Sequence, residues 1–96
     1  MKFSKDYSKL DKPIFTTIRK NTSHYRIKNV YGIHTPTKEF LGRVIITEPL
    51  NKKSITEKIA QDDADCSRDE LIAMLEKWYG KDFDDFILLT LAKEEI

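Results

Sequence analysis

Residues 67–80 restrict the fold most, because they carry the local signals of an amphipathic helix. Ser67 and Glu70 have the spacing of a capping box, in which a hydroxyl and a carboxylate satisfy the free amides of the first helical turn. Gly80 suits the left-handed position that commonly ends a helix. Between these signals, apolar residues recur at helical spacing: Leu71, Met74, Leu75, Trp78 and Tyr79. We predict that this stripe is buried against a sheet.

The other apolar residues are concentrated in segments with strand character. Residues 15–20, 24–27, 30–34, 39–48 and 86–91 are rich in β-branched and aromatic side chains. Gly42, inside one of these segments, favours a bulge or a sharp bend. A second capping box, Ser54 to Glu57, announces a shorter helix before the main one. Several strands, two helices and a final strand predict an α+β domain around a small, curved sheet.

Size and composition limit the classes of protein that fit. The chain has 96 residues, of which 40% are hydrophobic and 34% charged, and this size and composition predict one folded domain over residues 1–96. Within it we expect residues 1–11 to form a loose arm with a helical turn near Tyr7–Leu10. No apolar run is long enough to cross a bilayer, and the charged start is unlike a signal peptide. Cys66, the single cysteine, has no partner for an internal disulfide. We therefore expect a cytoplasmic protein with no membrane association.

The net charge of +1 hides an asymmetry between the two halves of the chain. Residues 1–53 carry 12 Lys/Arg and 4 Asp/Glu, a net charge of +8, whereas residues 54–96 carry 5 and 12, a net charge of −7. A basic patch of this size would attract a polyanion. The alternative is that the two halves fold against each other and neutralise their charges.

Residues 15–20 combine two hydroxyls and two cations in one predicted strand. Alternate side chains of a strand share a face, so Thr17 and Arg19 point one way and Lys20 the other. A hydroxyl beside a guanidinium is able to hold a phosphate, a carboxylate or the edge of a base. The alternative is a half-buried strand in which Arg19 only covers the rim of the sheet.

Cations and aromatic side chains alternate along the first half of the chain, a composition that suits single-stranded RNA, where bases stack and cations follow the phosphates. The candidate RNA-binding residues are Arg19, Lys20, Tyr25, Arg26 and Lys28. His24 and His34 lack the spacing of a metal site, so we predict no metal and no cofactor. The acidic residues 62–65 join the two helices and are expected to form a solvated linker, with weak cation binding as the alternative.

The order of these segments resembles the ASCH family of small PUA-like domains, over roughly residues 12–92. The resemblance is carried by Thr17-Ile18-Arg19, by Thr56-Glu57-Lys58-Ile59-Ala60 and by Asp69-Glu70-Leu71. It implies a PUA-like β-barrel of five to six strands with two to three flanking helices and a cleft beside the first strand. Family members are suspected of binding RNA. Some bacterial members are amidohydrolases that deacetylate N4-acetylcytidine with a lysine base, a threonine nucleophile and a glutamate proton donor.

On this resemblance Thr17 matches the threonine, Arg19 the following arginine, and Asp63 or Asp62 the acid. The position of the family lysine is occupied by Ile14, and Lys12 is the nearest candidate on the same strand parity. We expect a monomeric domain that binds RNA or a modified nucleoside. The alternatives are an amidohydrolase that uses Thr17, Lys12 and Asp63, and a module that binds a protein partner.

Overall fold

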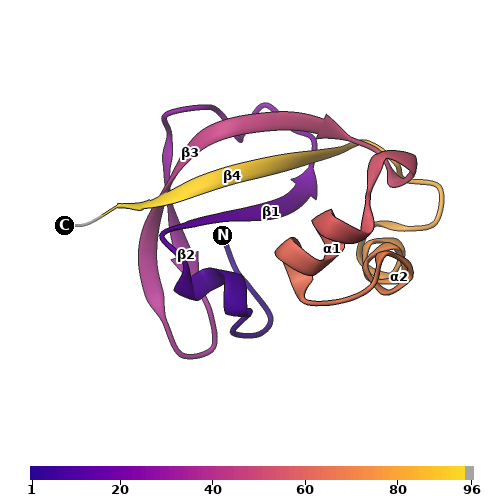
Figure 1. Cartoon of the computed structure of the whole chain (residues 1–96). Helices are drawn as coiled ribbons and strands as arrows, with labels where there is room; N and C mark the ends of the chain where they lie inside the picture. Colours follow the sequence, from indigo (N-terminus) through magenta and orange to yellow (C-terminus); the bar gives the residue numbers. More distant parts are fainter. Residues whose placement is uncertain (95–96) are drawn as a thin grey trace.

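The computed structural model describes residues 1–94. Within this range, no helix is long and apolar enough to cross a membrane. The elements follow the order of an α+β domain (Figure 1). They are the 3₁₀ helix η1 (Ser8–Asp11), β1 (Ile14–Lys20), β2 (Val30–His34), β3 (Glu39–Leu50), the 3₁₀ helix η2 (Lys52–Ser54), α1 (Glu57–Ala64), α2 (Arg68–Tyr79) and β4 (Phe86–Glu94).

The sheet is antiparallel throughout, with the strand order β1-β4-β3-β2. The last strand of the chain therefore lies between the first and the third, and the sheet curves into a half-barrel (Figure 1). The α+β class is confirmed, but residues 1–94 form four strands where five to six were expected. Residues 24–27, predicted as a strand, lie instead in the loop between β1 and β2, where Lys28 adopts a left-handed φ of 76°.

The bulge in β3 lies at Ile45 rather than at Gly42. The pairing of β3 with β4 shifts between Val44 and Ile46, which leaves Ile45 as the extra residue. Gly42 serves a different purpose, because a Cβ atom there would lie only 3.1 Å from Cδ2 of Leu91. The glycine thus leaves room for the side chains of Leu91 and Ile33 on the inner side of the sheet.

Both helices begin with a side-chain cap. In α2, Ser67 accepts a hydrogen bond from the Glu70 amide and the Glu70 carboxylate accepts one from the Ser67 amide, so the predicted capping box is confirmed. In α1 the cap is Thr56, which accepts from the amide of Ile59. Ser54, predicted as that cap, belongs instead to a capping box with Asn51 at the start of η2.

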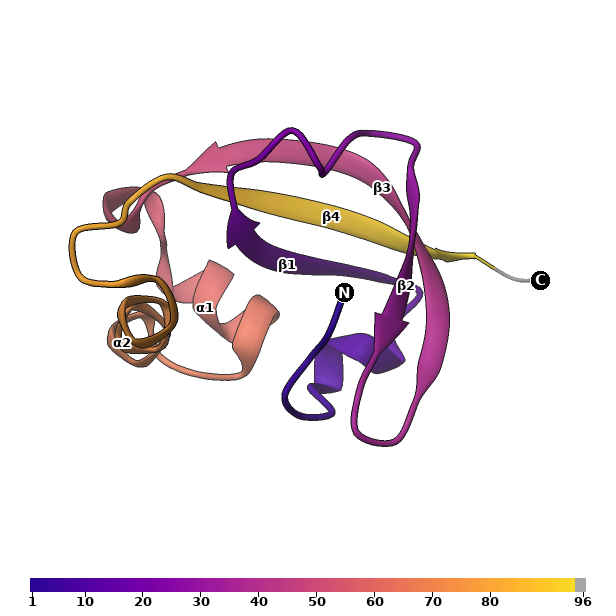
Figure 2. The same ribbon diagram turned by 180° about the vertical axis from the view of Figure 1, so that it is seen from behind.

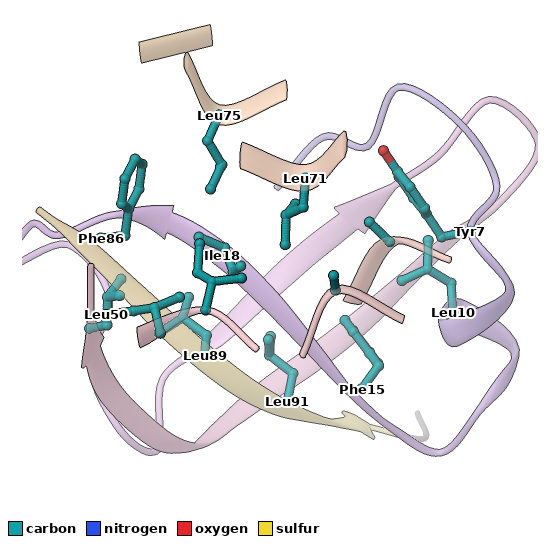
Figure 3. Close-up of a cluster of buried hydrophobic side chains, with 14 of the residues drawn as sticks. Tyr7, Leu10, Phe15, Ile18, Leu50, Leu71, Leu75, Phe86, Leu89 and Leu91 are labelled. Atoms are coloured by element: carbon teal, nitrogen blue, oxygen red, sulfur yellow. The ribbon is translucent and has the colours of Figure 1, made fainter. Parts of the chain in front are cut away.

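The helices cover one end of the sheet. Leu71 and Leu75 of α2 point toward Ile18 of β1, and Phe86 of β4 lies beside them (Figure 3). All four side chains are buried, so the inner edge of α2 belongs to the core. Trp78, predicted to be buried with this stripe, is instead 53% exposed. That prediction is wrong: Leu71 and Leu75 reach the core, whereas the Trp78 side chain remains open on the surface of α2.

The N-terminal segment, residues 1–11, lies against the opposite end of the sheet (Figures 1 and 2). The amide of Phe3 donates to the carbonyl of His34, and the amide of His34 donates to the carbonyl of Met1, which forms a parallel bridge with β2. Lys9 and Leu10 of η1 are buried. The segment that the sequence indicated as a loose arm therefore packs against the sheet and α1.

Candidate functional site

A cleft of about 480 Å³ lies beside β1 and is lined by the N-terminal segment and the two helices. Its lining comes from residues 2–9, from β1, from the end of α1 and from α2. Aromatic and aliphatic side chains make up most of the lining, and a few polar groups converge between them. This volume and composition are typical of pockets that bind small molecules, which usually enclose about 300–1,000 Å³.

Thr17 and Arg19 of β1 line this cleft, together with Ile18 between them. Nε of Arg19 donates to Oγ1 of Thr17 over 3.2 Å. The guanidinium also donates to the carbonyl of Lys2 and stacks on the ring of Phe3, with its central carbon 4.9 Å from the ring centroid. These contacts fix the guanidinium and leave the Thr17 hydroxyl proton free for another acceptor.

The polar centre of the cleft is a buried ion pair between Lys9 of η1 and Asp63 of α1. Nζ of Lys9 lies 3.1 Å from Oδ1 of Asp63, and both side chains are more than nine-tenths buried. The Thr16 hydroxyl donates to the same carboxylate oxygen over 3.2 Å. The Lys9 ammonium also lies 5.3 and 5.4 Å from the ring centroids of Phe3 and Tyr7, which add cation–π attraction.

Burial moves both members of this pair toward their neutral forms. It lowers the pKa of the Lys9 ammonium below its ordinary value, although the Asp63 carboxylate opposes the shift. It raises the pKa of the Asp63 carboxyl, against the opposing effects of Lys9 and of the hydrogen bond from Thr16. Burial thus favours a neutral amine and a neutral carboxylic acid, which differ from the ion pair by the transfer of one proton.

Lys9 was not predicted as a site residue from the sequence, which indicated Lys12. Lys12 is exposed and follows the end of η1, where its amide donates to the carbonyl of Lys9. The turn of η1 directs Lys9 inward, toward a carboxylate that lies 54 residues further along the chain. The only local signal for a buried Lys9 was the predicted helical turn near Tyr7–Leu10, which places this lysine close to the apolar side chains of Tyr7 and Leu10.

Asp63 is the acid that the structure brings to the cleft. Asp62, the alternative, points away and pairs with Lys58 one turn earlier in α1. The expectation of a solvated linker over residues 62–65 is wrong for Asp63, which is buried in the last turn of α1. Asp65 adopts a left-handed φ of 54°, and its carboxylate accepts hydrogen bonds from the hydroxyl and the amide of Ser8, which holds η1 against the end of α1.

The other candidate RNA-binding residues do not line this cleft. Lys20 is exposed, and its ammonium lies 5.3 Å from the ring centroid of Phe83. Tyr25, Arg26 and Lys28 belong to the loop between β1 and β2. That loop is held by hydrogen bonds, including one from the Arg26 amide to the Tyr31 hydroxyl and one from the Lys28 amide to the Val44 carbonyl. Only Arg19 of the predicted set contributes to the cleft.

The two histidines lie apart from the cleft and have other contacts. His24 packs edge-on against Tyr25, and Nδ1 of His34 lies 2.8 Å from the carboxylate of Glu39. Within residues 1–94, no three His, Cys, Asp or Glu side chains form a group that would hold a metal ion. The absence of a metal and of a cofactor stays a prediction from the sequence.

Comparisons of this chain with protein-family models, with curated proteins and with solved structures found no match.

Proposed function

We propose that this chain is an ASCH-like domain of the PUA-like type that binds RNA or a modified nucleoside in the cleft beside β1. The observation that carries the proposal is the convergence of Thr17, Arg19 and Asp63 in one cleft, together with Lys9. The sequence indicated the first three as site residues, although they come from two elements far apart in the chain. The half-barrel and its two flanking helices are compatible with a PUA-like fold. A complete PUA-like barrel would contain five to six strands.

The chemistry of the cleft suits the edge and the face of a base. Lys9 and Arg19 supply hydrogen-bond donors, while Asp63 supplies an acceptor and Thr17 supplies both. The surrounding apolar wall suits the ring itself. A base that carries an N–H beside a carbonyl would match an ammonium and a carboxylate only 3.1 Å apart. Uracil and guanine both present such an edge, and N4-acetylcytosine presents its N4–H beside the ring acceptor N3.

A titration of the protein with cytidine, N4-acetylcytidine and short single-stranded RNA tests the proposal. The expected result is a shift of the amide signals of residues 15–20 in NMR spectra, with saturation. Thr17→Val removes the cleft hydroxyl with little change in shape and should weaken binding. Thr22→Val, which alters an exposed hydroxyl in the loop after β1, is the matched control and should bind like the wild type. Amide signals that do not move with any of these ligands would contradict the proposal.

A second proposed function is the hydrolysis of an N-acyl nucleoside, and the buried Lys9–Asp63 pair supports it. Transfer of one proton within the pair gives a neutral amine and a carboxylic acid, with no change in total charge. The amine then accepts the Thr17 proton as Oγ1 attacks the acyl carbon. The carboxylic acid protonates the leaving nitrogen as its bond to that carbon breaks. Water afterwards releases the acyl group from Thr17. Lys9, rather than Lys12, is the base in this scheme.

Turnover of N4-acetylcytidine by three variants tests this second function. Thr17→Val and Lys9→Met should abolish turnover, because each removes a group that the scheme requires. Lys12→Met removes an exposed lysine nearby and should leave the rate unchanged. A rate that depends on Lys12, or one that survives both cleft variants, would contradict the assignment. Binding without turnover in the wild type would leave the cleft as a binding site.

A further inference from the structure

Trp78 differs from every other Phe, Tyr and Trp side chain in residues 1–94. The nine others each pack against another aromatic ring, as Tyr79 does with Phe83 and Phe86. Trp78 has neither a ring nor a cation against it among the residues described, and 53% of its surface is exposed. It lies on the α2 wall of the cleft, beside Met74. Because the half-exposed indole lines a cleft, it offers a ligand an aromatic surface that the protein itself leaves open.

The opposite wall is already occupied. Phe3 holds the guanidinium of Arg19 on its ring and packs edge-on against Tyr7 at 6.3 Å between ring centroids. Lys9 approaches both of these rings from the polar centre of the cleft. The rings of the N-terminal segment therefore hold the cations in place, and the indole on α2 is the aromatic surface left for a ligand.

We propose that Trp78 is the stacking platform for the base, and that the cleft therefore takes an unstacked base from a free nucleotide or a single strand, not from a duplex. This inference rests on the proposed function and specifies its ligand class. Stacking on an indole requires one open face of the base, which a duplex covers on both sides. The indole face and the Lys9–Asp63 centre lie in the same cleft, so the ring stacks while its edge meets the polar groups.

Fluorescence offers a direct test, because Trp78 is the single tryptophan of the chain. Binding of cytidine, N4-acetylcytidine or a short single strand should quench or shift its emission. A duplex of the same sequence should leave the emission unchanged at the same concentration. Quenching by the duplex that equals quenching by the single strand would overturn the ligand class.

Calorimetry with two substitutions and a control supplies the energetic test. Trp78→Ala should weaken binding about 5- to 150-fold, the range expected when one base loses its aromatic partner. Trp78→Phe retains a ring and should recover most of the affinity. Ile46→Ala alters a residue of similar exposure, 48%, outside the cleft lining and should bind like the wild type.

The results separate this inference from the function on which it rests. If ligands shift the amides of residues 15–20 while Trp78→Ala binds like the wild type, the stacking platform is wrong and the binding function stands. If no nucleoside or RNA binds the wild type, both are wrong. Both would be supported by amide shifts, quenched emission and an affinity that falls from the wild type to Trp78→Phe and then to Trp78→Ala.

Discussion

Replacing Lys9 with Met is expected to destabilise the protein by about 3–5 kcal/mol, because it leaves the buried Asp63 carboxylate without its cation. The Lys9 and Asp63 side chains are 6% and 7% exposed, so water replaces little of the lost interaction. The hydrogen bond from Thr16 remains and compensates only in part. Lys12→Met is the control, since that lysine is exposed, and it should change the unfolding free energy by no more than about 0.5 kcal/mol.

The double variant Lys9→Met/Asp63→Leu should be as stable as the wild type, or more stable by up to about 4 kcal/mol. Burial penalises both charges, as the lowered pKa of Lys9 and the raised pKa of Asp63 indicate. An apolar pair of similar volume avoids that penalty. The two substitutions should therefore be strongly non-additive.

The effect of Lys9→Met should depend on pH with a defined sign. Without Lys9, the pKa of the Asp63 carboxyl in the folded protein rises further above its ordinary value of 3.8. The folded state then binds a proton more readily than the unfolded state, so the unfolding free energy falls as the pH rises above that value. The destabilisation should be smallest below pH 3.8 and should grow toward neutral pH.

Urea denaturation followed by circular dichroism, at acidic and neutral pH, measures all of these quantities. With slopes of about 1–3 kcal/mol per molar urea, a loss of 3–5 kcal/mol shifts the midpoint by roughly 1–5 M. A double variant less stable than either single variant would contradict the predicted cost of the buried charges. A destabilisation by Lys9→Met that does not change with pH would contradict the predicted titration of Asp63.

Three further predictions concern the caps, the core and the charges. Ser67→Ala should lower the unfolding free energy by about 0.5–2 kcal/mol in urea denaturation, because it removes the cap of α2. Leu75→Ala should lower the unfolding free energy by about 2–5 kcal/mol in the same assay. Trp78→Ala should lower it clearly less, because the indole is 53% exposed. Equal losses for the two variants would contradict the exposed position of Trp78. Affinity for single-stranded RNA should fall with salt, and Lys28→Ala should reduce the slope of the logarithmic plot by about 0.7 if this lysine contacts a phosphate. An unchanged slope would remove Lys28 from the interface.

The sequence determined the features that depend on neighbouring residues. The capping box of Ser67 and Glu70 and the helical period behind it predicted α2, since both act within one or two turns. The alternation of a strand likewise predicted that Thr17 and Arg19 share a face, which their hydrogen bond confirms. Asp63 was selected through the family resemblance, but its burial was not foreseen.

The tertiary structure decided which of these groups meet and which stay open. Lys9 became part of the site because η1 packs against α1, a contact between segments more than 50 residues apart that leaves no periodic signal in the sequence. The helical stripe predicted the apolar face of α2, but not that Trp78 lies on the wall of the cleft, where 53% of its surface stays exposed. Residues 24–27 have strand propensity but no partner strand, and a strand forms only where another supplies its hydrogen bonds.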